Sequence, residues 1–131
     1  MTRFLGRTAL VTGSSGMGLA TALRLAREGA RVHCCGIDEG RNAAAREAAT
    51  GLPVTVTRVD LTDDGAVAAW VAQGAGEGLD ILVNAAGAQF YGDLGTTTPA
   101  DWDRCLAVNL RALYVASRQA WPHLRARGRG C

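Results

Sequence analysis

The segment that most constrains the fold is residues 11–18, Val-Thr-Gly-Ser-Ser-Gly-Met-Gly, which lies between an apolar run and an amphipathic helical pattern. Glycine lets the backbone turn tightly and approach a ligand closely. A helix that begins after such a turn also points its free N–H groups at an anion. The segment therefore predicts a phosphate-binding turn. Glycine-rich turns also join strands to helices where no ligand binds, so the neighbouring elements must decide.

Short apolar runs alternate with helical patterns over the first two thirds of the chain. We expect Leu19, Leu23 and Ala26 to form the apolar face of the first helix, which Gly29 should end. The alternation predicts an α/β fold, a Rossmann-like three-layer sandwich whose parallel sheet has about four strands. The expected strands are Arg7–Val11, Ala30–Cys35, Pro53–Val59 and Leu79–Val83, and the expected helices are Met17–Glu28, Glu39–Thr50 and Asp63–Ala75.

The last third of the chain predicts a loop followed by one long helix. Gly87–Thr97 has the composition of a disordered or lid-like stretch. The helix should start after Thr98, because Thr98 is a capping residue, a proline follows at the first helical position, and Asp101 stands third. We expect Pro122 to kink or break this helix.

Composition narrows the functional classes. The 131 residues fit a single domain, and a hydrophobic content of 48% suits a packed core. The net charge is +2 with arginines scattered singly, which argues against nucleic-acid binding. We expect no membrane partner and a cytoplasmic location, because no apolar run is long enough for a membrane span or a signal peptide. The four cysteines fit no metal spacing, and Cys34–Cys35 should be two small buried residues.

In a parallel sheet, ligands bind beyond the carboxyl ends of the strands. The residues that follow the four expected strands are Thr12–Gly18, Gly36–Asp38, Asp60–Thr62 and Asn84–Gly87. This series, together with Asn109 in the long helix, resembles the short-chain dehydrogenase/reductase family, oxidoreductases that use NAD(H) or NADP(H) on a Rossmann fold. The resemblance implies one catalytic residue, Asn109, and a cofactor site made by Thr12, Gly13, Ser14, Ser15, Gly16, Met17, Gly18, Asp38, Asp60, Leu61, Asn84, Ala85, Ala86 and Gly87.

Each match also has an ordinary structural interpretation. Asp60 can accept a hydrogen bond from the adenine amine or cap the helix that follows. Asn84 can tie neighbouring strands together while Gly87 lets the backbone pass a ribose, or the segment can be a plain turn. In the family, Asn109 holds a water in a proton relay. The alternative is an asparagine whose amide is satisfied by backbone groups.

Cofactor choice is weakly specified. The positions that resemble the family's ribose-binding site hold Gly36 and Ile37, so neither an acid for the 2′-hydroxyl nor an arginine for a 2′-phosphate stands in its usual place. Asp38 could reach a ribose hydroxyl and mildly favours NAD. Arg41 could meet a phosphate, but an exposed helix start is more typical of a solvated charge.

Two departures from the family pattern weaken the case for an active enzyme. The family's catalytic Ser and Tyr-x-x-x-Lys follow a fifth strand, and this chain ends before it and contains no lysine. Tyr114–Arg118 has the spacing with arginine for lysine, but it lies on the Asn109 helix and indicates packing or an interface. Only two residues separate Gly13 from Gly16, where the family has three. We expect the turn to absorb this change and phosphate binding to be weakened or lost.

These observations predict the N-terminal, cofactor-binding half of a short-chain dehydrogenase/reductase, an incomplete single domain spanning residues 1–131 that is catalytically incompetent alone. The alternatives are a non-catalytic oligomerisation or regulatory module and a decayed gene product. An exposed sheet edge and the apolar side of the long helix favour a homo-oligomer or pairing with a full-length relative. The residues expected on that side are Leu106, Leu110, Leu113 and Trp121.

Overall fold

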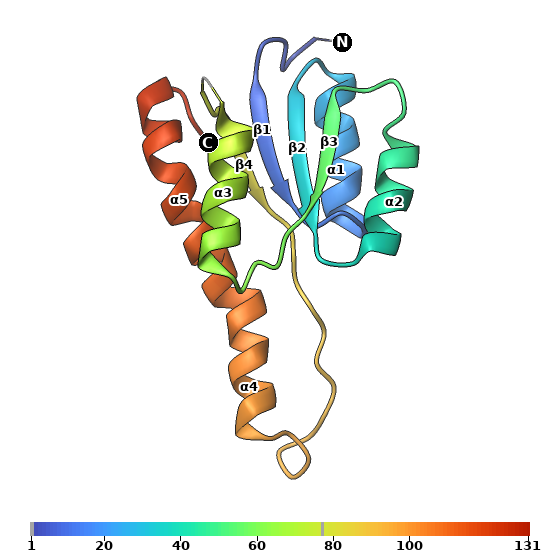
Figure 1. Cartoon of the computed structure of the whole chain (residues 1–131), viewed down its shortest axis with the longest axis vertical. Coiled ribbons are helices and arrows are strands. Elements are labelled where there is room, and N and C mark those ends of the chain that lie inside the picture. Colours follow the sequence, from blue (N-terminus) through green and yellow to red (C-terminus); the bar gives the residue numbers. More distant parts are fainter. Residues whose placement is uncertain (1, 77) are drawn as a thin grey trace.

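A computed structural model describes residues 2–76 and 78–131 and contains a four-stranded parallel sheet (Figure 1). The strand order is β3-β2-β1-β4, so the chain builds outward from β1 on one side and then crosses to the other. All three strand pairs are parallel, as the alternating pattern predicts. The strands are β1 (Thr8–Thr12), β2 (Arg31–Gly36), β3 (Val54–Arg58) and β4 (Ile81–Asn84).

Helices cover both faces of the sheet and complete the expected three layers (Figure 1). Helices α1 (Gly16–Arg27) and α2 (Glu39–Ala48) lie on one face, and α3 (Asp64–Ala75) and α5 (Ala112–Arg127) lie on the other. Alternate residues of each inner strand serve the two faces. In β1, Ala9 and Val11 pack toward α1 and α2, whereas Leu10 packs toward α3 and α5.

The apolar face of α1 differs from the prediction. Its buried residues are Gly18, Ala22, Leu25 and Ala26, which follow the i, i+4, i+7, i+8 spacing of one helical stripe. Ala26 was assigned correctly and Leu19 is partly buried against the core, but Leu23 lies outside the stripe. The helix ends before Gly29, as expected.

Cys34 and Cys35 are fully buried in β2, which confirms that they are core residues. Burial raises the pKa of Cys34 to about 11 and that of Cys35 to about 12. A thiol with so high a pKa is protonated near neutral pH and is a poor nucleophile. Neither cysteine is therefore placed to do redox or metal chemistry.

The last helical region begins as predicted and continues differently. Helix α4 (Pro99–Leu106) starts with a capping box between Thr98 and Asp101. A π-helical segment, η1 (Ala107–Arg111), then joins it to α5, which runs through Pro122 to Arg127. The expected break at Pro122 is therefore wrong. Buried residues of α5 before Pro122, among them Val115 and Ala120, and the partly buried Leu124 after it hold the helix against the core.

The outer edge of β4 is less open than the sequence suggests. The N–H of Cys131 donates to the carbonyl of Asp80 at 2.8 Å, and the carbonyl of Cys131 accepts from Leu82 at 2.9 Å. These are the two hydrogen bonds of one parallel bridge centred on Ile81. The last residue thus covers the start of this edge. Within the described ranges, no helix is both long enough and apolar enough to cross a bilayer.

Candidate nucleotide-binding site

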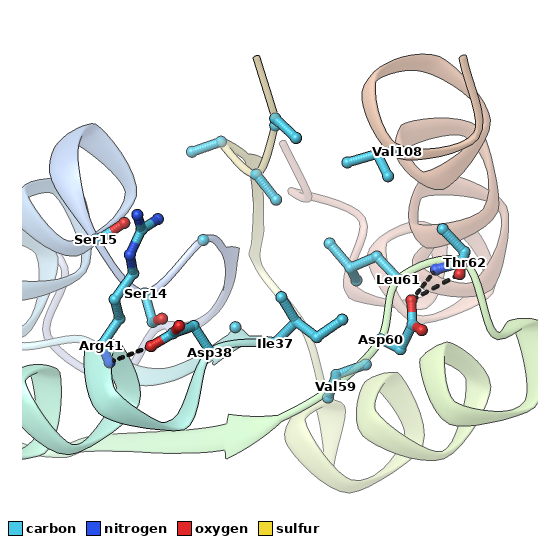
Figure 2. A pocket seen from close by; sticks show the side chains of 16 residues that line it. Ser14, Ser15, Ile37, Asp38, Arg41, Val59, Asp60, Leu61, Thr62 and Val108 are labelled. Atoms are coloured by element: carbon cyan, nitrogen blue, oxygen red, sulfur yellow. Dashed lines mark hydrogen bonds between the residues drawn. The ribbon is translucent and has the colours of Figure 1, made fainter. Parts of the chain in front are cut away.

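The carboxyl ends of the strands surround a pocket of about 230 Å³ (Figure 2). It lies where the chain order in the sheet reverses, between β1 and β4. Open α/β sheets bind their ligands at this kind of position. The lining residues are Gly13, Ser14, Ser15, Gly36, Ile37, Asp38, Arg41, Val59, Asp60, Leu61, Thr62, Ala85, Ala86, Gly87, Ala88 and Val108.

The glycine-rich turn brings α1 into direct contact with the end of β1. A Cβ on Gly18 would lie 2.2 Å from the carbonyl oxygen of Gly13, so only glycine allows this approach. The close contact fixes the start of α1 against the end of β1. The side chain of Ser15, the N-cap residue of α1, makes no capping hydrogen bond to the described N–H groups. The first N–H groups of α1 therefore keep their capacity to bind an anion.

Thr12 connects this turn to the end of β4. Its Oγ1 accepts hydrogen bonds from the N–H groups of Ala85 and Ala86, both at 3.1 Å. The hydroxyl holds the Asn84–Gly87 turn beside the glycine-rich turn. Thr12 itself is buried and lies behind the pocket wall.

Asp60 lines the pocket at the end of β3. It accepts hydrogen bonds from the N–H of Thr62 at 2.9 Å and from its hydroxyl at 2.7 Å, and these bonds lower the pKa of the Asp60 carboxyl. The N-cap of α3 is Asp63, which accepts from the N–H of Ala66 at 3.0 Å. The helix-capping interpretation of Asp60 is therefore wrong, and its carboxylate is an ionised acceptor at the pocket.

Asn84 and Asn109 fix the loop that leaves β4. The Nδ2 of Asn84 donates to the Ser117 hydroxyl at 3.2 Å. Its buried Oδ1 has no partner among the described residues. Asn109 accepts from the N–H of Ala88 and donates to its carbonyl, each at 2.9 Å. The Asn109 amide is thus hydrogen-bonded to the backbone of Ala88, and it ties η1 to the pocket rim.

Most of the predicted cofactor-site residues meet in this pocket, and others lie beside it. Gly16 and Gly18 shape the turn, and Met17 is 82% exposed and does not line the pocket. Sequence reasoning missed several lining residues because their apolar or small side chains carry no chemical signal. The adjacency of Val108 to Asn109 was the one available clue. The missed residues are Val59, Ala88 and Val108.

The parallel sheet, the glycine-rich turn and the pocket at the strand ends define a Rossmann-like α/β domain. Known proteins narrow this class. A family model described as Enoyl-(Acyl carrier protein) reductase matches residues 11–131. Gluconate 5-dehydrogenase of Gluconobacter oxydans is 37% identical over 135 residues, covering 95% of this chain and 51% of that protein. D-beta-hydroxybutyrate dehydrogenase of Cupriavidus necator is 35% identical over 130 residues, covering 95% and 50%.

Solved structures agree. A short chain dehydrogenase from Mycobacterium smegmatis superposes with a TM-score of 0.81 at 32% identity, covering 96% of this chain and 55% of that one. A variant of actinorhodin polyketide ketoreductase with NADPH gives a TM-score of 0.87 at 28% identity, covering 95% and 50%. The chain belongs to the short-chain dehydrogenase/reductase family. It spans about half the length of the curated relatives that it matches.

Proposed function

We propose that residues 1–131 form the dinucleotide-binding part of a short-chain dehydrogenase/reductase and bind NAD or NADP. The observation that carries this proposal is the pocket between β1 and β4, which joins the glycine-rich turn to the strand-end residues of β2, β3 and β4. Members of the family use nicotinamide dinucleotides as cofactors, and the solved structure of one relative contains NADPH.

The residues present fit such a ligand. The pyrophosphate would bind Gly13–Ser15 and the uncapped N-terminus of α1, where N–H groups and the helix dipole favour an anion. Asp60 would accept a hydrogen bond from the adenine amine, because each carboxylate oxygen has acceptor capacity beyond the bonds from Thr62. The Ala85–Ala88 segment would face the nicotinamide side, where its small residues let the backbone come close.

The bound nicotinamide would supply hydride transfer between the cofactor and an alcohol or ketone, the general chemistry of the family. We propose that these 131 residues do not complete that reaction alone. The chain has no lysine to lower the pKa of a catalytic tyrosine. Tyr114 and Arg118 hydrogen-bond to each other at 3.2 Å on α5, and neither lines the pocket. Asn109 is the one member of the family's catalytic set in this chain.

Isothermal titration calorimetry with NADH and NADPH tests cofactor binding. We expect saturable binding of at least one dinucleotide. Asp60→Ala should weaken it, while Asp103→Ala, a change of the same kind on α4 and outside the pocket, should not. Absence of binding at millimolar dinucleotide would refute the proposal. So would equal affinities in wild type and Asp60→Ala, because the ligand would then bind elsewhere.

Oxidation of NADH or NADPH at 340 nm with a panel of ketones tests the second part of the proposal. The wild-type chain should give no turnover above the rate in buffer. Turnover that Asn109→Ala abolishes would show that these residues form a working site, and the proposed incompetence would be wrong.

We also propose that the apolar side of the last helical region is a protein–protein interface. It is formed by α4, η1 and α5 and leaves several large apolar side chains exposed, as surfaces that bind another protein often do. A second copy of this chain, or a full-length relative, would bury it. The exposed residues are Trp102, Leu106, Leu110, Leu113, Tyr114 and Trp121.

A further inference from the structure

We propose that the pocket selects a dinucleotide with a 2′-phosphate, NADP(H), and that Arg41 is the selecting residue. This preference is opposite to the one that Asp38 suggests in the sequence. It rests on the proposed binding of a dinucleotide in this pocket. It goes beyond that proposal by naming the residue that recognises the 2′ substituent of the adenosine ribose. Three features of the β2–α2 turn support it.

First, Gly36, the last residue of β2, has no room for a side chain. A Cβ on Gly36 would lie 2.0 Å from Ser14 Oγ and 2.6 Å from Asn42 Oδ1. Asn42 is fully buried and donates through Nδ2 to the Gly36 carbonyl at 2.9 Å, so it is held in place. Packing therefore excludes an acid at Gly36, and Ile37, the other position that resembles the family's ribose-binding site, carries no carboxylate.

Second, Asp38 already serves the backbone of α2. Its Oδ1 accepts the N–H of Arg41 at 2.8 Å and caps the helix. The positive end of the α2 dipole partly balances the charge of this carboxylate. Turning Asp38 toward a ribose would break the capping hydrogen bond. The presence of this carboxylate therefore does not favour NAD over NADP.

Third, Arg41 is a pocket-lining cation with no carboxylate within ion-pair distance among the described residues. Figure 2 shows its side chain rising beyond Asp38 toward Ser14 and Ser15, across the pocket rim. The acid next along α2, Glu39, is paired with Arg46 instead. Arg58 adds positive charge near the rim by donating to the Ile37 carbonyl at 3.1 Å. A guanidinium and two serines that line the same pocket suit a phosphate group.

The strength of the preference follows from this geometry. A phosphate monoester carries a charge of about −1.5 to −2 near neutral pH, and a hydrogen-bonded contact with a charged group corresponds to roughly a 10- to 100-fold change in affinity. Because Arg41 is exposed, salt should screen the interaction. We therefore expect NADPH to bind at least about tenfold more tightly than NADH at low salt, with a smaller ratio at high salt.

Calorimetric titrations with NADPH, NADH, 2′,5′-ADP and 5′-AMP at low and high sodium chloride test the inference. Arg41→Ala should reduce the NADPH and 2′,5′-ADP affinities to those of NADH and 5′-AMP, and leave the latter two unchanged. Arg27→Ala, an exposed arginine on α1 outside the pocket, should change none of the four. Ile37→Asp, at a position that is 56% exposed, should shift the preference toward NADH without a packing conflict.

The outcomes separate this inference from the proposed function. If wild type binds NADH as tightly as NADPH, the preference is wrong and the dinucleotide site stands. If Arg41→Ala keeps the NADPH preference, another residue reads the phosphate and the inference fails. If 2′,5′-ADP binds in an Arg41-dependent way but neither dinucleotide binds, the phosphate reader stands and the dinucleotide proposal fails. If none of the four binds, both fail.

Discussion

Asp80 shows how one buried side chain can organise distant parts of the chain. It lies just before β4, its side chain is 1% exposed, and it accepts the N–H of Thr8 at 3.0 Å. Arg7, Arg127 and Arg129 donate to it at 3.1, 3.3 and 2.9 Å. Burial by itself would raise the pKa of the Asp80 carboxyl, but these four donors outweigh it and lower the pKa to about 2. Both chain ends are thereby fastened to the amino end of the sheet.

Asp80→Ala should destabilise the fold by about 3 kcal/mol, because the change leaves three partly exposed arginines without their shared carboxylate and the N–H of Thr8 without its acceptor. The arginine side chains are 30 to 50% exposed, which places the effect at the lower end of the usual range. Urea unfolding at pH 7 measures it. Asp103→Ala, at an exposed position on α4, should change stability little. Equal stabilities of the two variants would contradict this role.

The Asp80 carboxylate should also make the stability of the fold depend on pH in the acid range. Its folded-state pKa of about 2 lies below the unpaired value of 3.8. A lowered pKa contributes stability that is fully present above pH 4 and is lost as the pH falls from 4 to 2. Urea unfolding of wild type at several pH values in this window should show the loss, and Asp80→Ala should show a shallower slope. Parallel pH profiles for the two proteins would refute the assignment.

Gly18→Ala tests the contact between the glycine-rich turn and α1. The added Cβ would lie 2.2 Å from a backbone oxygen, so α1 must shift away from the pocket. We expect a loss of about 1 to 3 kcal/mol of stability, typical of overpacking, and weaker dinucleotide binding. Gly65→Ala in α3 is the control, since its Cβ would meet only the Asp63 carboxylate at an ordinary 3.4 Å. Unchanged melting and binding in Gly18→Ala would show that the turn tolerates a side chain.

At the scale of elements, the last helical region begins at a well-defined cap, and its α-helical geometry is interrupted beside the pocket. The Thr98–Asp101 capping box begins α4, and η1 departs from α-helical geometry where Asn109 reaches Ala88. Arg111 then forms a bidentate ion pair with Asp64 at 2.6 and 2.8 Å, which ties η1 to the start of α3. The interruption thus coincides with contacts that join the helix to the pocket rim.

Pro122→Ala should stabilise α5. Pro122 lies inside the helix and has no N–H to donate to the carbonyl of Arg118. Its ring also crowds that carbonyl, which disfavours helical geometry in the preceding turn. Alanine restores that hydrogen bond, and we expect a gain of up to about 3 kcal/mol. Thermal unfolding followed by circular dichroism at 222 nm measures it. A lower melting temperature would mean that the proline ring makes stabilising contacts that outweigh the lost hydrogen bond.

At the scale of the whole molecule, the two ends of the sheet have different roles. The chain termini and the Asp80 cluster lie at the amino end, whereas the pocket lies at the carboxyl end, and α4 with its preceding loop extends beyond it (Figure 1). The apolar side of α4, η1 and α5 is available to a partner along the flank. The proposed nucleotide site and the proposed interface therefore lie on separate surfaces.

Leu110→Asp should shift the chain toward monomer if that flank is an interface. Leu110 is 62% exposed and lines an open apolar groove on this flank together with Leu106 and Tyr114. A dimer formed through this face would therefore bury a charge placed at residue 110. Sedimentation velocity across a concentration series should show association of wild type and loss of it in the variant. Leu94→Asp, on the exposed loop before α4, is the control. A wild-type monomer at all concentrations would refute self-association through this face.

The sequence by itself determined the elements that local patterns encode. Alternating apolar runs specified the parallel sheet, the Thr98 cap specified the start of α4, and glycine spacing located the turn at the pocket. These features depend on residues close together in the chain, so their physics is readable there.

The tertiary structure decided what depends on neighbours far away in sequence. Packing set the buried stripe of α1, carried α5 through Pro122, and showed that Asp63 rather than Asp60 caps α3. It also brought Ser14 and Asn42 against Gly36, which closes that position to an acid and leaves Arg41 facing the pocket. Such contacts arise only when β1, β2 and α2 are assembled, because burial and close approach are properties of the packed molecule.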